Sequence, residues 1–258
     1  MPPSADPWQE TFRVRSYEVE PGGHASVQTL CHYFEEAAGN HAQALGLSVE
    51  QLASQGLTWV LSRLHVQVAA FPRWRDTVRV TTWPSGQNGL FALREFQVHD
   101  EGGRLLARAT SGWVMIDVQR RRPVRLPGFL RAYLFPRPDR AVEDDFTRLR
   151  PPPDGYERAR RFHVRYSDLD LNRHVNNVRY VEWAVETLPP AFLETHRLAG
   201  LEIHFRAETG YDAAVIAEAA SDAAAGTGTG FWHRLRREDD DQDVAVARTR
   251  WRPAAPSD

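Results

Sequence analysis

Residues 162–177 read FHVRYSDLDLNRHVNN, and residues 12–27 read FRVRSYEVEPGGHASV. At a constant offset of 150 residues, both stretches begin with Phe-x-Val-Arg, continue with an acidic, aliphatic and acidic residue, and reach a histidine, His24 or His174. A match sustained at one offset without a gap indicates an internal duplication. We therefore expect each stretch to open one copy of the same structural unit.

The segments that follow the two stretches also correspond. They are the helix-like stretches 27–45 and 178–188, the strand-like runs 59–68 and 201–207, and the aspartates Asp76 and Asp212 that open a further strand. The helix-like stretches carry apolar residues at helical spacing, whereas the strand-like runs are rich in β-branched and aromatic residues. The sequence predicts an α+β fold with two units, each a strongly curved antiparallel sheet with one long helix.

Composition limits the function classes. The 258 residues carry a formal net charge of −2, and 42% of them are hydrophobic. This balance suits a packed core and argues against bulk nucleic-acid binding, which needs a strong positive field. We see no apolar run long enough to span a membrane and no secretory or transit pattern, and the single Cys31 excludes an internal disulfide. We expect a cytoplasmic globular protein.

Prolines and charged residues divide the chain. We predict an N-terminal domain at residues 1–135, a linker at 136–160, a C-terminal domain at 161–252 and a disordered tail at 253–258. The acidic run 238–241 lies between two strand-like segments, so it is best interpreted as a solvated hairpin tip.

The second copy carries a candidate polar site. Asp170, Asn172 and His174 are spaced so that an extended segment places all three side chains on one face. The good cap residues Asn176 and Asn177 follow, so the three would lie at a helix N-terminus, where backbone N–H groups favour negative charge. Such residues are also common in turns and caps. Spacing alone leaves both interpretations open.

Glu208 is the fourth candidate. It ends an alternating run in which His204, Arg206 and Glu208 share one strand face. A solvated strand face explains this pattern equally well, and spacing alone does not connect Glu208 to His174.

Other site types are absent from the sequence. The histidines form no His-Glu-x-x-His motif, no cysteine pair exists, and neither a nucleophile elbow nor a glycine-rich phosphate loop is present. Cys31 lies in the apolar stripe of the first helix and is expected in the core. We expect neither a metal ion nor a cofactor.

From about residue 12 to 251, the chain resembles the acyl-acyl carrier protein thioesterases. The motifs that carry the resemblance are WVLSR (59–63), FPRWRD (71–76), TWP (82–84), ARATSGWVM (107–115), SDLDLNRHVNNVRY (167–180) and FRAE (205–208). The resemblance implies tandem hotdog domains, in which each sheet wraps its helix and the single chain forms a pseudo-dimer. Further oligomerisation is left open.

The resemblance also implies the site. The family's catalytic Asp, Asn, His and Glu fall on Asp170, Asn172, His174 and Glu208. The next residue is often Cys in the plant enzymes and was once assigned as a nucleophile, but here it is Thr209. A thiol cannot be obligatory at that position in this protein.

The reaction that the resemblance implies is hydrolysis of fatty acyl-acyl carrier protein, which releases a free fatty acid and terminates chain elongation. Asn172 and backbone N–H groups would hold the carbonyl oxygen, while Glu208 acts as general base or nucleophile. His174, oriented by Asp170, would tune Glu208 and protonate the leaving thiolate. The expected partner is an acyl carrier protein, with docking candidates in arginines 120–122, 158, 160 and 161.

Three alternatives share the fold. They are an acyl-coenzyme A thioesterase, a non-catalytic lipid-binding protein and an enoyl-thioester hydratase. The resemblance implies that the first half holds the acyl tail. The first half is expected to lack the chemistry, because Gly22 stands where Asn172 stands, and counting back from Asp76 puts Pro72 opposite Glu208. We therefore expect one active site per chain. The preferred acyl chain cannot be read from the sequence.

Overall fold

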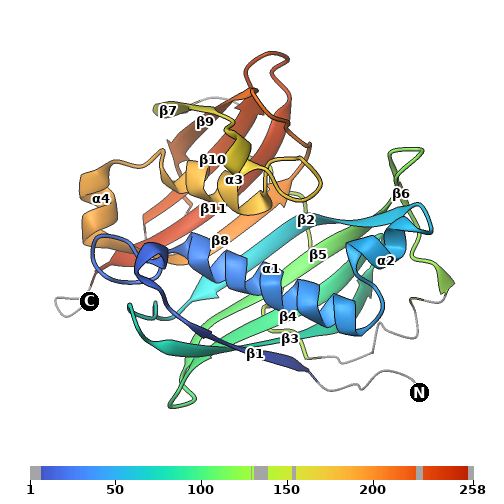
Figure 1. Cartoon of the computed structure of the whole chain (residues 1–258). Coiled ribbons are helices and arrows are strands. Elements are labelled where there is room, and N and C mark those ends of the chain that lie inside the picture. Colours follow the sequence, from blue (N-terminus) through green and yellow to red (C-terminus); the bar gives the residue numbers. More distant parts are fainter. Residues whose placement is uncertain (1–6, 129, 131–138, 153–154, 225–228, 255–258) are drawn as a thin grey trace. The chain divides into compact units, whose positions relative to one another are not determined.

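The computed structural model divides the chain into two compact units, Met1–Asp145 and Phe146–Asp258 (Figure 1). The residues that it describes are 7–128, 130, 139–152, 155–224 and 229–254. Among these, no helix has both the length and the apolar character needed to cross a bilayer.

The first unit is an antiparallel sheet with one long helix on one face. Its elements are β1 (Trp8–Arg13), α1 (Val27–Ala44), α2 (Val49–Ala53), β2 (Leu57–Val68), β3 (Thr77–Asn88), β4 (Phe91–Asp100), β5 (Leu105–Asp117) and β6 (Arg122–Val124). The strand order within this unit is β1-β3-β4-β5-β2, and β6 pairs with β5. Figure 1 shows α1 lying along the sheet.

Helix α1 forms where the sequence predicts it. Ser26 caps its N-terminus by accepting a hydrogen bond from the Thr29 backbone N–H at 3.1 Å, and Gly46, with φ of +73°, lies just past its end. Leu30 and Phe34 are buried against the sheet. Each such side chain contributes roughly 1.5–3 kcal/mol through removal from water. An apolar stripe therefore holds the helix on the sheet.

The second unit repeats this arrangement. Its elements are β7 (Arg158–His163), α3 (Asn177–Val185), α4 (Pro190–Thr195), β8 (His196–Phe205), β9 (Ala214–Ser221), β10 (Thr229–Arg237) and β11 (Asp243–Pro253). The antiparallel order within the unit is β8-β11-β10-β9-β7, which matches the first unit strand for strand. The predicted α+β fold in two copies is confirmed.

Aromatic contacts show how closely the two units correspond. Phe12 on β1 stacks on Tyr33 of α1, with ring centroids 4.4 Å apart. Phe162 on β7 stacks on Trp183 of α3 at 5.5 Å. The same pair of positions, 150 residues apart, therefore fastens the helix to the edge strand in both units.

Two sequence predictions about local structure need correction. The residues Pro84-Ser85-Gly86 form a sequence typical of a turn and predict that the strand ends after Trp83. They instead form a bulge inside β3, where pairing with β4 shifts register between Pro84 and Gly86 and the strand continues. The helix predicted at 178–188 ends earlier, at Val185, and Pro190 begins α4 instead. Proline at the start of a helix loses no hydrogen bond, so it can begin one as readily as it stops one.

The described part of the expected linker is packed rather than loose. Ala141 and Val142 are buried. The Arg140 guanidinium contacts the fully buried Glu95 carboxylate at 2.9 Å, and Asp144 lies 3.0 Å from the His65 imidazole. These contacts hold the segment on the first unit. Residues 136–138 and 153–154 lie outside the described residues.

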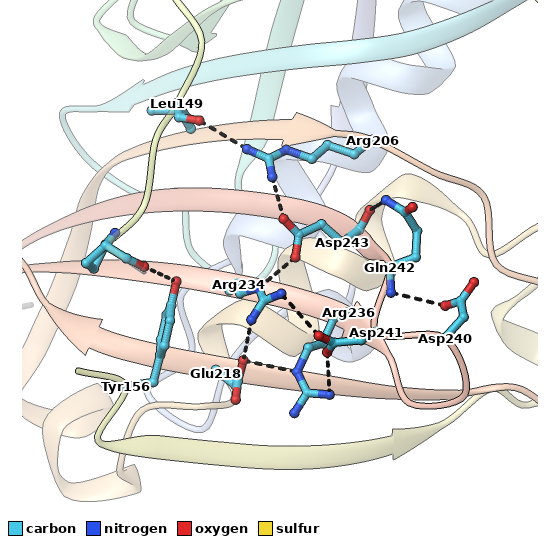
Figure 2. Close-up of polar contacts among 11 residues, drawn as sticks. Leu149, Tyr156, Arg206, Glu218, Arg234, Arg236, Asp240, Asp241, Gln242 and Asp243 are labelled. Atoms are coloured by element: carbon cyan, nitrogen blue, oxygen red, sulfur yellow. Dashed lines mark hydrogen bonds and ion pairs between the residues drawn. The ribbon is translucent and has the colours of Figure 1, made fainter. Parts of the chain in front are cut away.

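The continuation of that segment is held on the second unit. Phe146 and Leu149 are buried, and the Leu149 carbonyl accepts a hydrogen bond from Arg206 at 3.1 Å (Figure 2). Arg206 also contacts Asp243 at 2.5 Å, and Asp243 pairs with Arg234 at 2.6 Å. This ionic network fixes the C-terminal end of β8, immediately before Glu208.

The structure also places the acidic run and part of the predicted C-terminal tail. The acidic run 238–241 is the connection between β10 and β11, as predicted. Of the expected tail, Pro253 belongs to β11 and the Ala254 N–H donates to the Thr195 carbonyl at 2.8 Å. Residues 255–258 lie outside the described residues.

Cys31 lies on the buried face of α1, and its side chain is almost wholly removed from solvent. Burial raises the pKa of its thiol above the ordinary range. The prediction that Cys31 belongs to the core is confirmed.

Candidate active site

The segment that carries three of the four candidate residues is a tight turn. The Asp170 N–H donates to the His174 carbonyl at 2.8 Å, and the Arg173 N–H donates to the Asp170 carbonyl at 3.0 Å. Arg173 has a φ of +63°, which lies in the left-handed region that residues other than glycine adopt mainly in turns. The prediction of an extended segment with three side chains on one face is therefore wrong. Asp and Asn residues stabilise turns, and this local preference prevailed.

The Asp170 carboxylate stabilises this turn. Its Oδ1 accepts the backbone N–H of Asn172 at 2.8 Å and the backbone N–H of His174 at 3.1 Å. Within the described residues, no hydrogen bond joins this carboxylate to the His174 ring. Asp170 thus orients the backbone that carries Asn172 and His174, whereas the sequence predicted that it would orient the imidazole.

The turn leads directly into α3. The Asn176 side chain caps the helix by accepting the Val178 N–H at 2.8 Å, and the Asn176 N–H donates to the Asp168 carbonyl at 2.9 Å. The prediction that Asn176 begins the helix is confirmed. The N-terminus of a helix carries partial positive charge, so it attracts negative charge that develops nearby.

Glu208 lies beyond the end of β8 rather than on it. Strand β8 ends at Phe205, so the predicted alternation of His204, Arg206 and Glu208 on one strand face does not hold. The Arg237 guanidinium donates to the Glu208 carbonyl at 2.8 Å. On the other side, the Val175 N–H donates to the Thr209 carbonyl at 2.9 Å. These two bonds hold the Glu208 segment against the 169–175 turn.

The turn and the Glu208 segment bring an imidazole and a carboxylate together. His174 Nε2 and Glu208 Oε2 are 3.4 Å apart, and both side chains are partly exposed. This distance permits proton transfer or electrostatic coupling with little movement. Sequence spacing could not connect these two residues, which lie on different segments of the unit.

Asn172 completes the set. Asn172 is exposed on the turn, and its side-chain amide makes no hydrogen bond to any residue that the structure describes. The amide is therefore available to an incoming carbonyl group. The structure brings all four predicted residues into one region of the second unit.

Sequence reasoning missed Arg237. It lies at the end of β10, beside the acidic run that was expected to be only a solvated tip, and its guanidinium contacts Asp240 at 2.6 Å. The ion pair fixes the side chain that holds the Glu208 carbonyl. The only available signal was a charged residue next to a hairpin, which is too common to be informative.

No group of three or more His, Cys, Asp or Glu side chains in the described part of the chain is arranged to hold a metal ion.

The first unit has the same backbone turn with other side chains. The Glu20 N–H donates to the His24 carbonyl at 2.8 Å, and Gly23, with φ of +79°, occupies the place of Arg173. Gly22 stands where Asn172 stands, as predicted. No amide side chain is therefore available at this position of the first unit.

The partner of Glu208 in the first unit needs correction. The Ala25 N–H donates to the Pro72 carbonyl at 2.8 Å, just as the Val175 N–H donates to the Thr209 carbonyl. Pro72 therefore matches Thr209, and Phe71 stands in the place of Glu208. Counting back from Asp76 and Asp212 failed because Arg75, not Asp76, has the left-handed conformation that Asp212 shares. Neither Phe71 nor Pro72 carries a carboxylate.

The fold and this site define a class. Two units of the same strand order, each with one long helix, form a tandem hotdog protein. One of the two units brings a carboxylate and an imidazole together beside the turn that carries Asn172 and leads into its helix.

Comparison with known proteins places the chain within that class. Residues 5–133 match the model of the acyl-ACP thioesterase N-terminal domain, and residues 153–253 match that of the C-terminal domain. The chain belongs to the acyl-ACP thioesterase family.

Individual relatives agree with this assignment. The chain is 34% identical over 264 residues to a chloroplastic palmitoyl-acyl carrier protein thioesterase from Cuphea hookeriana, covering 95% of this chain and 62% of that protein. The chain thus spans somewhat under two thirds of the length of this and other curated relatives that it matches.

Solved structures show the same architecture. The 12:0-ACP thioesterase from Umbellularia californica superimposes with a TM-score of 0.86 at 31% identity, covering 96% of this chain and 94% of that one. An acyl-ACP thioesterase from Bacteroides thetaiotaomicron has a TM-score of 0.83 at 24% identity, covering 95% and 97%. The second likeness supports the fold.

Proposed function

We propose that this protein hydrolyses the thioester bond of fatty acyl groups carried on acyl carrier protein and releases the free fatty acid. The observation that carries the proposal is the 3.4 Å approach of His174 Nε2 to Glu208 Oε2 beside the start of α3. Family membership and the printed activities of the relatives support the choice of substrate.

The first part of the mechanism is polarisation of the thioester carbonyl. The carbonyl oxygen approaches the exposed Asn172 amide and the N-terminus of α3. As the carbonyl carbon becomes tetrahedral, negative charge develops on this oxygen, and preorganised donors stabilise it. One such donor is typically worth about 3–4 kcal/mol of barrier. The Asp170 bonds keep the Asn172 backbone in place while this occurs.

The second part is attack on the carbonyl carbon. Glu208 takes a proton from a water molecule whose oxygen attacks the carbon, or its own carboxylate attacks and the resulting anhydride is then hydrolysed. In both routes the carbon–sulfur bond breaks and the thiol leaves. His174 donates a proton to the departing sulfur and regains one from the reacting water, through Glu208 in the first route and directly from the water that hydrolyses the anhydride in the second. The products are a fatty acid and the free thiol of the carrier.

The position of the acyl chain is a further part of the proposal. We assign binding of the acyl tail to the first unit, as the resemblance implied. The turn of this unit lacks the amide and the carboxylate that the chemistry needs, so the chemistry is assigned to the second unit. Relatives bear names with palmitoyl, dodecanoyl and 12:0 groups, so membership of the family leaves chain length open.

The expected docking arginines receive little support. Arg158, Arg160 and Arg161 pair with Glu157, Glu186 and Glu238 at 3.5, 3.0 and 2.8 Å. Their charges are therefore partly neutralised within the chain. Docking of a carrier protein on these residues stays a prediction, and activity that falls with added salt on carrier-bound substrates would support it.

The test is turnover on matched substrates. The purified chain is given the same acyl group on acyl carrier protein and on coenzyme A, over a series of chain lengths, and free thiol and free acid are both measured. We expect thiol and acid in equal amounts, with a higher kcat/KM on the carrier protein. Preference for coenzyme A would identify the alternative thioesterase, whereas substrate loss without thiol release would contradict hydrolysis.

A further inference from the structure

The arginine that contacts the Glu208 backbone has an acidic counterpart in the first unit. The strand register identifies the two positions, through the paired residues Phe12, Val78 and Asp100 on β1, β3 and β4, and Phe162, Val215 and Arg237 on β7, β9 and β10. Asp100 therefore stands where Arg237 stands. The two copies of the duplicated unit carry opposite charges at this place.

The backbone beside this position follows the same path in both units. The Arg206 N–H donates to a carbonyl of β11 at 2.8 Å, and the Ala69 N–H donates to the corresponding carbonyl of β5 at 2.8 Å. Two residues further along the chain, Glu208 aligns with Phe71, in agreement with the bonds of the two turns. The units therefore differ here in their side chains and not in their backbone.

The Arg237 guanidinium uses three different nitrogen atoms. Its Nε and Nη2 donate to the two oxygens of the Asp240 carboxylate at 3.1 and 2.6 Å, and its Nη1 donates to the Glu208 carbonyl at 2.8 Å. A bidentate pair with a carboxylate fixes the plane of a guanidinium group. Asp240 therefore directs the third nitrogen toward the Glu208 backbone.

Asp240 is itself fixed in the hairpin between β10 and β11. Its Oδ1 accepts the Gln242 backbone N–H at 3.1 Å (Figure 2), and the hydrogen bonds from Arg237 lower the pKa of its carboxyl to about 2. In the first unit, Asp100 accepts the Arg104 N–H at 2.8 Å within its own hairpin. A carboxylate cannot donate a hydrogen bond, so Asp100 cannot hold the Phe71 carbonyl as Arg237 holds that of Glu208.

Two consecutive carbonyl groups at the candidate site are thus held from different segments. Arg237 bonds the Glu208 carbonyl at 2.8 Å, and the Val175 N–H bonds the Thr209 carbonyl at 2.9 Å. The Glu208 side chain leaves the backbone at this point and reaches to 3.4 Å from His174 Nε2. A shift of the backbone here would change the distance between the carboxylate and the imidazole.

We propose that Arg237 is a positioning residue for Glu208: its guanidinium, held in place by Asp240, fixes the Glu208 carbonyl and keeps the carboxylate within reach of the His174 imidazole. The inference rests on the proposed function. Arg237 acts through the backbone of Glu208, so its role requires no contact with the substrate. The second unit then differs from the first in the support of its site as well as in its reacting side chains.

The decisive experiment measures kcat and KM on a carrier-bound acyl substrate for Arg237→Gln, Asp240→Asn and the double variant. We expect Arg237→Gln to lower kcat about tenfold with KM within about twofold, because misplacement of a reacting group slows the chemical step. Asp240→Asn should lower kcat about threefold, and the double variant should be no slower than Arg237→Gln, because both changes remove the same support.

These kinetic results can contradict the proposal. A wild-type kcat in Arg237→Gln, a loss that appears in KM alone, or fully additive effects of the two single changes would overturn it. Asp240 is exposed at the hairpin tip, so Asp240→Asn supplies the test if Arg237→Gln does not fold.

Arg237→Lys separates the charge of the residue from its geometry. An ammonium group keeps the positive charge, but it lacks the planar fork that pairs with Asp240 and still presents a donor to Glu208. We expect Arg237→Lys to recover only part of the kcat that Arg237→Gln loses. Full recovery would show that the charge alone matters and would overturn the positioning role.

A matched control lies one residue earlier on β10. Arg236 contacts Glu218 of β9 at 3.3 Å and Asp241 of the same hairpin at 3.0 Å (Figure 2), and its side chain is about as exposed as that of Arg237. Arg236→Gln removes a comparable ionic contact and should leave kcat within about twofold of the wild type. An equal loss of kcat in Arg236→Gln and Arg237→Gln would overturn the specific role of Arg237.

A second readout needs no turnover. The Val175 amide is protected from hydrogen exchange by its bond to the Thr209 carbonyl, which directly follows the carbonyl that Arg237 holds. We expect this amide to exchange about three- to tenfold faster in Arg237→Gln than in the wild type or in Arg236→Gln. Unchanged exchange would overturn the role of Arg237. Absence of thioester hydrolysis in the wild type would instead overturn the proposed function, so the two failures are distinguishable.

Discussion

The turn at residues 20–24 and the turn at 170–174 have the same backbone and different side chains. In both, the N–H of the first residue bonds the carbonyl of the histidine at 2.8 Å, and the fourth residue has positive φ. Only the second turn carries Asn172, and only the segment bonded to it supplies a carboxylate, Glu208. The scaffold and the chemistry are therefore separable: the fold preserves the turn in either case, and a few side chains decide what it can do.

The largest expected effect comes from removing the carboxylate–imidazole pair. Glu208→Ala and His174→Ala should each lower kcat by about 10²- to 10⁴-fold, because each removes a group that would move a proton in the proposed reaction. Steady-state turnover on acyl-acyl carrier protein measures this. Thr209→Ala is the matched control and should keep most of the activity. Full activity in Glu208→Ala would defeat the assignment.

The number of sites tests the same comparison. Titration with a non-hydrolysable thioester analogue should reach saturation at one molecule per chain, because the first unit lacks the amide and the carboxylate. Binding of two molecules per chain, with Glu208→Ala weakening the binding of only one of them, would show that the first unit also binds the reacting group.

The next effect comes from giving the second turn the side chain of the first. Asn172→Gly reproduces Gly22 and removes one donor to the developing oxyanion, so we expect kcat to fall by about 10²- to 10³-fold. KM should change much less, because the lost interaction belongs to the transition state. A loss confined to KM would show that Asn172 only binds the ground state.

Each unit also holds a buried histidine whose pKa is lowered, which makes stability sensitive to acid. Burial lowers the pKa of His233 to about 3, and burial together with Arg94 lowers that of His41 to about 4. The unfolded chain binds these protons near pH 6.5, so the stabilisation is complete above that pH and is lost as pH falls toward the folded pKa values.

Each of the two histidines is expected to lower the free energy of unfolding by about 3 kcal/mol when the pH falls from 7 to 4. Denaturant unfolding between pH 4 and pH 7 measures it. His233 also bonds Thr249 at 2.9 Å, so His233→Gln should be less stable at pH 7 but should lose less stability on acidification than the wild type. An equal loss in both proteins would show that His233 does not titrate on unfolding.

The smallest expected effect concerns the residue with positive φ in each turn. Arg173 adopts a conformation that suits glycine, as Gly23 does in the first unit, so Arg173→Gly should be neutral or stabilising by up to about 1 kcal/mol. Gly23→Ala should destabilise by about 1 kcal/mol, although nothing lies within 4 Å of the added Cβ. Thermal unfolding measures both. Stabilisation by Gly23→Ala would contradict the strain argument.

The repeated fold could be predicted because its signals are local. The apolar spacing of residues 27–45 predicts α1 almost to the residue, and the offset of 150 predicts its counterpart α3. The bulge at Pro84 could not be predicted, because tertiary pairing with β4 carries the strand through a typical turn sequence.

The site was only partly predictable for a related reason. Asp170, Asn172 and His174 were identified together, but as an extended segment, because the competing turn depends on bonds from the Asp170 carboxylate that spacing does not reveal. Glu208 was connected to them by resemblance alone, since its approach to His174 depends on two bonds between distant segments. The alignment of the two repeats was wrong by one residue for the same reason: Phe71, rather than Pro72, corresponds to Glu208.

The solitary, deeply enclosed thiol of Cys31 makes the protein unusually convenient to assay. A colorimetric thiol reagent should react with the sulfhydryl that the proposed reaction would liberate, while the native chain contributes almost no background, because burial suppresses the reactive thiolate of Cys31. The same reagent added to an unfolding chain would label one sulfur per molecule. One dye can thus count turnovers under native conditions and unfolded molecules under denaturing ones.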